Sequence, residues 1–327
     1  MSYSVDYPLV SVIIPLYNCE RFIVQAVESI LKQSYENYEI IVIDDGSTDE
    51  SRQRLEPYFD RIRYIYQYNQ GVAAARNRGI ELSKGELVAF LDHDDYWLSD
   101  KLAVQVNYLR ENPKIGMVHS GWRRVNTAGE TLGEVMPWHK APTLDLEEWV
   151  RWKPVLLSAM LFRRDWLVEV GGLDTGFQQA CDVDLVLRLS LMGCGAGWIH
   201  RVMTCYQEHD RNDSLNTTVQ ANESWQVLDK FFQLPDIPDT IRQYEQEYRY
   251  YTLVWSAWRL YSTGFTREMI KYLQRSLAYS SYCLTETILD WVNCFQACSE
   301  EYDWSFNVED LIASQEWKSL TSEALSI

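Results

Sequence analysis

Apolar runs alternate with amphipathic stretches over the N-terminal third of the chain, and this alternation restricts the fold more than any other feature. The runs predict strands at 10–16, 39–43, 61–67 and 87–91, and the stretches between them predict helices at 20–32, 47–58 and 71–82. Residues 87–91 are apolar throughout, as expected of a strand buried on both faces. The pattern indicates an α/β fold with a mostly parallel sheet flanked by helices.

Acidic residues follow two of these strands. The fourth strand runs into residues 92–95 (Asp-His-Asp-Asp), and the second into residues 44–46 (Asp-Asp-Gly). Because side chains alternate along a strand, Asp92 and Asp94 point the same way, at the strand end where open α/β sheets bind ligands. Two carboxylates there form half of a site for Mg²⁺ or Mn²⁺. A single pair of this kind is usually an ordinary solvated turn, but two acidic strand ends in one sheet favour a nucleotide pocket.

Two further polar residues stand at element boundaries. Asp182 opens the amphipathic stretch that continues through residues 183–191, where it is either a plain helix cap or a catalytic base, and the two roles are compatible. At a helix N-terminus the macrodipole is expected to keep the pKa of this carboxyl low. His209 follows the last predicted strand, 203–207, where it is either a packed histidine or a metal ligand.

Composition restricts the partners. The formal net charge of −17 argues against nucleic acid, and an acidic protein that binds a phosphate ester needs a cation to offset its charge. The seven cysteines include no C-x-x-C pair, which fits a reducing compartment without disulfides or zinc. No signal peptide or membrane-spanning stretch is recognisable, so we expect a cytoplasmic protein, with peripheral contact at the inner face of the membrane left open.

Strand patterns end near residue 220, and helical stripes rich in Trp, Tyr and Leu continue from there. We therefore expect residues 1–220 to form the α/β domain and residues 221–327 a smaller all-α extension. The stripes at 251–261 and 269–277 flank a Thr-Gly turn and loosely resemble a tetratricopeptide helix pair. One such pair cannot bury its own apolar face, so the extension should pack on the main domain or form a homodimer.

Six motifs in a fixed order resemble glycosyltransferase family 2, whose members have the GT-A fold. They stand at residues 10–18 (VSVIIPLYN), 43–49 (IDDGSTD), 69–77 (NQGVAAARN), 92–95 (DHDD), 171–174 (GGLD) and 181–185 (CDVDL). Each motif alone is weak, but their shared order and spacing are specific. The resemblance implies an inverting, hexosyltransferase-type enzyme that takes a nucleoside-diphosphate sugar, by default a UDP-sugar. It implies a saccharide or lipid-linked acceptor and a role in cell-surface polysaccharide biosynthesis.

The resemblance also assigns residues to the donor nucleotide. Pro15 and Tyr17 would line its base, and Asp45 would accept hydrogen bonds from the base or the ribose. Arg76 and Asn77 would lie near the nucleotide and its phosphates.

Metal and base are assigned in the same way. Asp92 and Asp94 correspond to the family's D-x-D motif, with Asp94 on Mn²⁺ or Mg²⁺ and Asp92 on the ribose or the metal. Asp182 matches the catalytic base, and His209 matches a histidine that can complete the metal site. One base without a covalent nucleophile predicts single displacement with inversion.

Two residues depart from the family pattern. Cys181 stands where Glu usually precedes the base, and a thiol cannot replace the hydrogen bonds of a carboxylate. Gln207 stands where Arg is common, which affects the expected geometry around His209. The substitution at Cys181 keeps one alternative open: a catalytically weak or inactive nucleotide-sugar-binding module that recruits partners through its helical extension.

Overall fold

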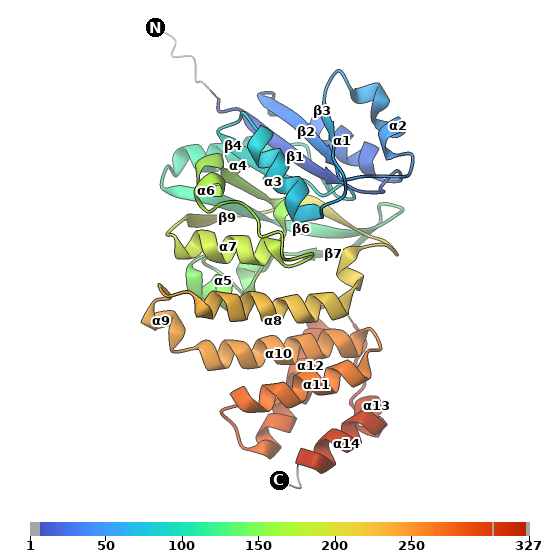
Figure 1. Ribbon diagram of the computed structural model, residues 1–327, viewed down its shortest axis with the longest axis vertical. Helices are drawn as coiled ribbons and strands as arrows, with labels where there is room; N and C mark the ends of the chain where they lie inside the picture. Colours follow the sequence, from blue (N-terminus) through green and yellow to red (C-terminus); the bar gives the residue numbers. More distant parts are fainter. Residues whose placement is uncertain (1–6, 303, 325–327) are drawn as a thin grey trace. The chain divides into compact units, whose positions relative to one another are not determined.

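The computed structural model describes residues 7–302 and 304–324, which divide into two compact units between Asp210 and Arg211. Strands and helices form the first unit, whereas the second is helical (Figure 1). The domain boundary expected near residue 220 falls within a helix of the second unit, α8 (Thr217–Gln233). Within the described ranges, no helix has both the length and the apolar composition that a membrane span requires.

Nine strands of the described chain join in one sheet in the order β3-β2-β1-β4-β8-β6-β9-β5, with β7 beside β6. Their bounds are β1 (Val10–Leu16), β2 (Tyr38–Asp44), β3 (Arg63–Tyr66), β4 (Leu87–Phe90), β5 (Tyr96–Trp97), β6 (Ile115–Asn126), β7 (Thr131–Val135), β8 (Met160–Arg163) and β9 (Gly195–Glu208). Strands β1 to β4 pair in parallel, as the alternation predicts. The α/β class is therefore confirmed.

The remaining pairings make the sheet mixed. Strand β9 runs parallel to β6, but β8 is antiparallel to both of its neighbours, β4 and β6. Strand β7 follows β6 through a tight turn in which Asn126 Oδ1 accepts the N–H groups of Ala128 and Glu130. A connection this short can only reverse the chain, so this part of the sheet is antiparallel.

Seven α-helices of the described chain belong to the first unit: α1 (Ile23–Leu31), α2 (Ser51–Leu55), α3 (Val72–Leu82), α4 (Lys101–Glu111), α5 (Leu146–Trp152), α6 (Arg164–Glu169) and α7 (Cys181–Leu191). Both faces of β1 are covered, because its side chains alternate. Val12 and Ile14 join a buried cluster with residues of α1 and α4. Ile13 meets α3, where a Cβ on Gly79 would lie 2.3 Å from Ile13 Cγ2. That glycine lets the helix approach the strand.

Helix α2 starts later than the sequence predicts. The expected start at Ser47 is occupied by a loop, because Ser47 Oγ accepts the N–H of Asn18 at 3.0 Å. The Asn18 side chain in turn accepts the N–H of Thr48 at 2.7 Å. These contacts tie the loop after β2 to the end of β1, and the helix begins only at Ser51.

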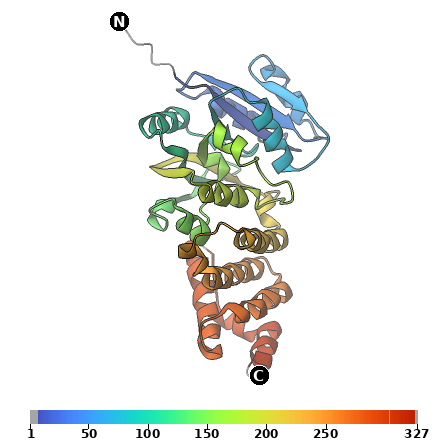
Figure 2. The ribbon, with the colours of Figure 1, turned by 60° about the vertical axis from the view of Figure 1, so that its left-hand side comes forward.

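The second unit contains α8, α9 (Asp239–Arg242), α10 (Glu245–Ser262), α11 (Thr266–Ser276), α12 (Leu284–Glu301), α13 (Val308–Ala313) and α14 (Gln315–Ala324). Helices α10 and α11 pack side by side (Figure 1 and Figure 2), joined by a turn in which Gly264 has φ 85°. Trp258 and Trp291 are buried and donate their ring N–H groups to Ser299 and Ser276. Both stripes predicted at 251–261 and 269–277 are thus helical.

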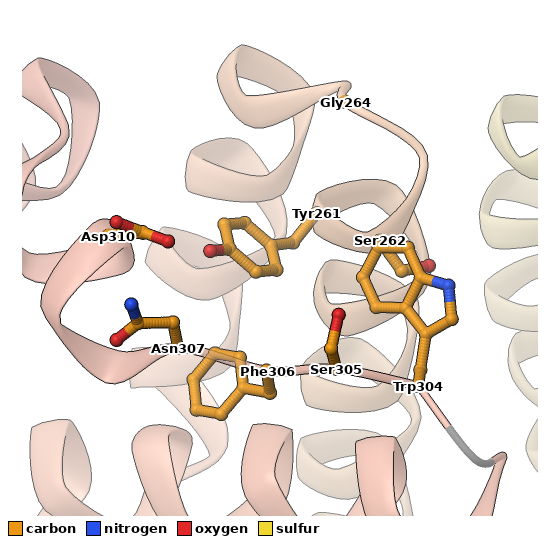
Figure 3. A pocket seen from close by; sticks show the side chains of 8 residues that line it. All are labelled: Tyr261, Ser262, Gly264, Trp304, Ser305, Phe306, Asn307 and Asp310. Atoms are coloured by element: carbon orange, nitrogen blue, oxygen red, sulfur yellow. The ribbon is translucent and has the colours of Figure 1, made fainter.

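A cavity of about 450 Å³ opens in the second unit between the end of α10 and the segment before α13 (Figure 3). Its lining is Tyr261, Ser262, Gly264, Trp304, Ser305, Phe306, Asn307 and Asp310. Of these residues Asp310 alone is charged, so the cavity does not suit the phosphates of a nucleotide. The candidate site residues named from the sequence all lie in the first unit.

Candidate active site

The two acidic strand ends meet at one edge of the sheet. Leu16 of β1 is paired with Asp44 of β2, and Ile13 of β1 with Phe90 of β4. Because these pairings are parallel, the residues that follow each strand emerge at the same edge. Both acidic strand ends therefore lie at one edge of the sheet, and the nucleotide pocket that they favour stays a prediction.

The turn 92–95 is anchored to several parts of the first unit. Asp95 N–H donates to Asp92 O at 3.0 Å and closes the turn, and Asp95 Oδ1 accepts the N–H of Gln207 at 3.2 Å. His93 Nδ1 lies 2.8 Å from Pro15 O. Burial raises the pKa of Asp95 well above its usual range, and the charges of Asp94 and Asp92 add to this rise. Asp95 is therefore a buried support of the turn.

Arg76 joins this turn to the start of α7. Its Nη2 donates to Asp92 Oδ1 at 2.5 Å, and its Nη1 lies 3.6 Å from Cys181 Sγ, 105 residues away in the chain. Burial opposes the charge on Arg76, but the charge and the hydrogen bond of Asp92 outweigh burial and raise the pKa of the guanidinium. Helix α3, the end of β4 and the first turn of α7 therefore converge on one cation.

Asp182 lies next to this junction and is partly buried. Burial raises the pKa of its carboxyl to about 6, against the charge of Arg76 and the N–H of Val183, which donates to Asp182 Oδ1 at 2.7 Å. The expectation of a low pKa is wrong here, because desolvation outweighs the helix terminus. The residue before α7 is Ala180 and provides no side-chain cap, so Asp182 is not the N-cap residue.

Asp94 contacts His209 across the site. His209 Nε2 lies 3.1 Å from Asp94 Oδ2, and its ring stacks on Phe22 with centroids 4.7 Å apart. Burial alone would raise the pKa of Asp94, but the contacts with His209 and the charge of His93 lower it. These two residues are 115 positions apart in the sequence, and the fold brings them together.

The donors present fit a Mn²⁺ or Mg²⁺ ion shared with a nucleotide. Carboxylate and imidazole both bind Mn²⁺, and nucleotide metals typically use one or two protein ligands together with phosphate oxygens. Across residues 7–302 and 304–324, no three His, Cys, Asp or Glu side chains form a metal cluster. Asp94 and His209 are in contact, whereas Asp92 is paired with Arg76. A metal role for Asp92 stays a prediction.

Asp45 orders the loop before α3. Its Oδ1 accepts hydrogen bonds from Gln67 Nε2 at 2.7 Å and from the N–H of Gln70 at 2.9 Å, and its Oδ2 accepts the N–H of Gly71 at 2.8 Å. The carboxylate is buried and its oxygens receive three hydrogen bonds from the protein. Its contact with a base or ribose stays a prediction.

Asn77 pairs with the backbone of the Gly171-Gly172 loop. Its amide donates to Leu173 O at 2.8 Å and accepts Leu173 N–H at 2.8 Å. Gly172 has φ 74°, and a Cβ there would lie 2.5 Å from Asn77 Oδ1. Both observations explain the glycine at this position. The fold thus gives Asn77 a structural role, and its nucleotide contact stays a prediction.

The residues predicted to line the base differ in exposure. Pro15 is buried in β1 and its carbonyl oxygen contacts His93, whereas Tyr17 is 47% exposed. An exposed ring beside the strand end is suited to stacking on a flat base. The nucleotide contact itself stays a prediction.

The structure also gives roles to two residues, Asp44 and Ser158, to which the sequence reasoning assigned none. Asp44 accepts Ser47 N–H at 2.7 Å and the Tyr64 hydroxyl, and it shapes the loop after β2. Ser158 Oγ accepts the N–H of Asp92 at 3.1 Å. Ser158 interrupts an otherwise apolar run, 155–162, and that interruption is the one signal that would have found it.

Comparison with known sequences identifies relatives. Residues 11–169 match the profile described as Glycosyl transferase family 2. An uncharacterized glycosyltransferase of Rickettsia typhi is 31% identical over 230 residues, which cover 68% of this chain and 70% of that protein. Chondroitin synthase of Escherichia coli is 29% identical over 235 residues, covering 68% of this chain and 32% of that protein. The chain spans about a fifth of the length of several other curated relatives that it matches.

Two solved structures share the fold. TarS of S. aureus, in complex with UDP-GlcNAc, has a TM-score of 0.62 at 17% identity and covers 91% of this chain and 93% of that chain. Mannosyltransferase PcManGT of Pyrobaculum calidifontis, in complex with GDP-Man and Mn²⁺, has a TM-score of 0.62 at 19% identity. The match covers 98% of this chain and 85% of that chain. These likenesses establish the fold. Together with the profile and the Rickettsia typhi relative, they lead to one conclusion: the chain belongs to glycosyltransferase family 2 and has the GT-A fold.

Proposed function

We propose that the chain is a metal-dependent, inverting glycosyltransferase that moves a sugar from a nucleoside-diphosphate sugar to a hydroxyl of a saccharide or lipid-linked acceptor. The position of Arg76 carries this proposal. Its guanidinium contacts both Asp92, at the D-x-D turn, and Cys181, which precedes Asp182. The candidate base and the candidate donor-binding turn are therefore neighbours of the same buried cation.

Asp182 is the proposed general base. With a pKa of about 6, its carboxyl is ionised near neutral pH but remains basic enough to accept a proton. It would take the proton of the acceptor hydroxyl as that oxygen bonds to the anomeric carbon and the bond to the diphosphate breaks. A single displacement of this kind inverts the anomeric configuration.

Negative charge grows on the nucleoside diphosphate as it leaves. A divalent cation held by Asp94 and His209 would stabilise that charge as a Lewis acid. Arg76 adds fixed positive charge in a buried position, and its guanidinium stays protonated throughout. Asp92 would orient this guanidinium and contact the ribose or the metal.

The comparisons support classes of substrate. TarS was solved with UDP-GlcNAc and PcManGT with GDP-Man, which supports a nucleoside-diphosphate sugar, and a UDP-sugar is our default donor. Similarity to chondroitin synthase supports a saccharide acceptor, hexosyl transfer and a role in cell-surface polysaccharide biosynthesis. Cytoplasmic location, contact with a membrane surface and a homodimer formed through residues 221–327 stay predictions.

Turnover of UDP-, GDP- and dTDP-sugars tests the proposal. The full chain is incubated with each donor and Mn²⁺, Mg²⁺ or excess EDTA, and release of the nucleoside diphosphate is followed. We expect one nucleotide class to be consumed with metal and spared with EDTA, and NMR of the product to show inversion. Full activity in excess EDTA would remove the metal from the mechanism.

A nucleotide-sugar-binding module without catalysis is the second candidate, and Cys181 favours it. Burial raises the pKa of this thiol to about 12, so an uncharged group stands where the family usually has a carboxylate. Thermal shifts with UDP, GDP and dTDP in the presence of Mn²⁺ report binding without turnover. A clear shift with no release from any donor would favour the module over the enzyme.

A further inference from the structure

A buried serine continues the hydrogen bonding of β4 where the sheet ladder stops. The last ladder-like bond runs from Leu91 N–H to Ile13 O at 3.0 Å. The next N–H, of Asp92, donates to Ser158 Oγ at 3.1 Å, although the two residues are 66 positions apart. Ser158 belongs to the 3₁₀ turn Leu157–Ala159 and is fully buried.

The backbone around Ser158 is held by side chains from four different elements. Three successive carbonyls, of Ser158, Ala159 and Met160, accept hydrogen bonds from buried side chains. Ser158 O accepts Trp97 Nε1 at 2.7 Å and Thr204 Oγ1 at 3.1 Å, Ala159 O accepts Gln105 Nε2 at 2.9 Å and Ser120 Oγ at 3.1 Å, and Met160 O accepts Lys101 Nζ at 3.2 Å. The donors come from β5, β9, α4 and β6, so Ser158 has little freedom to move.

A fully buried lysine, Lys101, is one of the side chains that hold this segment. Its side chain is fully buried, and within the described chain its ammonium contacts Gln105 Oε1 at 2.7 Å, Met160 O and the Trp97 ring at 4.1 Å. These partners are neutral, and burial lowers the pKa of Lys101 well below its usual range, because an ammonium buried without a carboxylate is unfavourable.

A buried serine hydroxyl can bond to the backbone of its own turn or helix. Ser83 and Ser276 do so, donating to carbonyls three residues earlier. Ser158 instead presents its oxygen to the first residue of the D-x-D turn. That turn also receives Arg76 and His209 through side chains, so the serine is the backbone anchor at its start.

We propose that Ser158 is a positioning residue for the D-x-D turn: its hydroxyl fixes the backbone of Asp92 and thereby the direction of the Asp92 and Asp94 carboxylates. This inference rests on the proposed function, because its consequence is binding of a divalent cation and a nucleoside diphosphate. Supporting groups of metal ligands commonly change metal affinity by roughly 10–100-fold when removed.

The test compares Ser158→Ala with Ser11→Ala. Ser11 is an equally buried serine whose Oγ accepts a backbone N–H, that of Gly85, at 2.9 Å. Gly85 precedes β4, whereas Asp92 follows it, so the control removes the same kind of bond at the opposite end of one strand. Ser11→Ala also removes the hydrogen bond that Ser11 Oγ donates to Glu39 Oε1 at 2.6 Å, which is why its Tm should fall. Mn²⁺ affinity is measured by electron paramagnetic resonance, with and without UDP, and Tm is measured on the same samples.

We expect Ser158→Ala to weaken Mn²⁺ binding in the presence of UDP by about tenfold, and Ser11→Ala to lower Tm with Mn²⁺ affinity within about twofold of wild type. Ser158→Cys, which keeps the volume but accepts hydrogen bonds weakly, replaces Ser158→Ala if that variant does not fold. Wild-type Mn²⁺ affinity in Ser158→Ala, or equal losses of affinity in both variants, would overturn the inference about Ser158 and leave the proposed function standing. If the wild-type chain binds no Mn²⁺ with UDP, GDP or dTDP, the proposed function falls as well.

Discussion

Arg76 Nη1 lies 3.6 Å from the sulfur of Cys181, so the guanidinium that pairs with Asp92 has an uncharged second partner. A carboxylate at position 181 would share Arg76 and stand beside Asp182. Its negative charge would disfavour ionisation of Asp182, because like charges at close range raise the pKa of a carboxyl. With an uncharged thiol at position 181, the positive charge of Arg76 stabilises the ionised Asp182 carboxyl more strongly.

Cys181→Asp tests this relationship with little change in volume. We expect the acidic limb of the kcat/KM profile to move upward from about pH 6 by roughly one unit, because a second carboxylate raises the pKa of Asp182. Cys181→Ser is the matched neutral control and should leave the limb in place. Equal midpoints in the two variants would show that position 181 does not tune the base.

Asp182→Asn should lower kcat by about 10²–10⁴-fold, the usual contribution of a general base, with UDP affinity nearly unchanged. Initial rates and calorimetric UDP binding measure the two effects. Asp165→Asn is the matched control, since Asp165 is also an acid in the first turn of a helix but lies at α6 and is exposed. Unchanged turnover in Asp182→Asn would remove this residue from the mechanism.

The same pKa predicts how rate and stability depend on pH. In the wild-type chain, kcat/KM should be level above about pH 6 and fall below it as Asp182 is protonated.

The folded-state pKa of about 6 lies above the ordinary 3.8, so the ionised carboxyl destabilises the fold above pH 6. This penalty is relieved as the pH falls from about 6 toward 3.8. Asp182→Asn should therefore raise Tm at pH 8 and lose that advantage near pH 4.

The sequence was sufficient for the parallel half of the sheet. Apolar runs at 39–43 and 87–91 have the length and composition of buried strands, and the acidic residues directly after them must emerge at a common edge if the strands are parallel. The placement of Asp92 and Asp94 follows from this geometry. The mixed half was less predictable, because the direction of β8 depends on which strands it joins and not on its own residues.

Long-range polar contacts were beyond sequence reasoning. Nothing in the local pattern indicates that Arg76 reaches a thiol 105 residues away or that Ser158 accepts the N–H of Asp92. The rise in the pKa of Asp182 likewise depends on burial by surrounding elements. Asn77 shows the opposite limit. The resemblance assigns it to the nucleotide, but in the structure its side-chain amide is already paired with the backbone of Leu173.

Asn77→Ala separates a structural role from nucleotide binding. The substitution removes two hydrogen bonds to Leu173 and leaves its backbone groups without these partners. We expect a loss of about 2 kcal/mol in the free energy of unfolding and a Tm lower by several degrees, with UDP affinity of the folded protein unchanged. Asn107→Ala, at an exposed position of α4, is the control and should leave Tm nearly unchanged. A fall in UDP affinity with an unchanged Tm would instead place Asn77 on the nucleotide.

The pair Asp94 and His209 should control metal affinity. Asp94→Asn removes the charged ligand, and His209→Ala removes the imidazole that lies 3.1 Å from it, so each should weaken Mn²⁺ binding in the presence of UDP by at least about tenfold. His200→Ala is the control for the histidine: His200 is exposed on β9 and stacks on Trp138, and its loss should leave Mn²⁺ binding unchanged. Excess Mn²⁺ should restore part of the turnover in His209→Ala, because the Asp94 carboxylate is still present. Wild-type Mn²⁺ affinity in His209→Ala would assign this histidine to packing against Phe22 and leave Asp94 as the one protein ligand supported by the test.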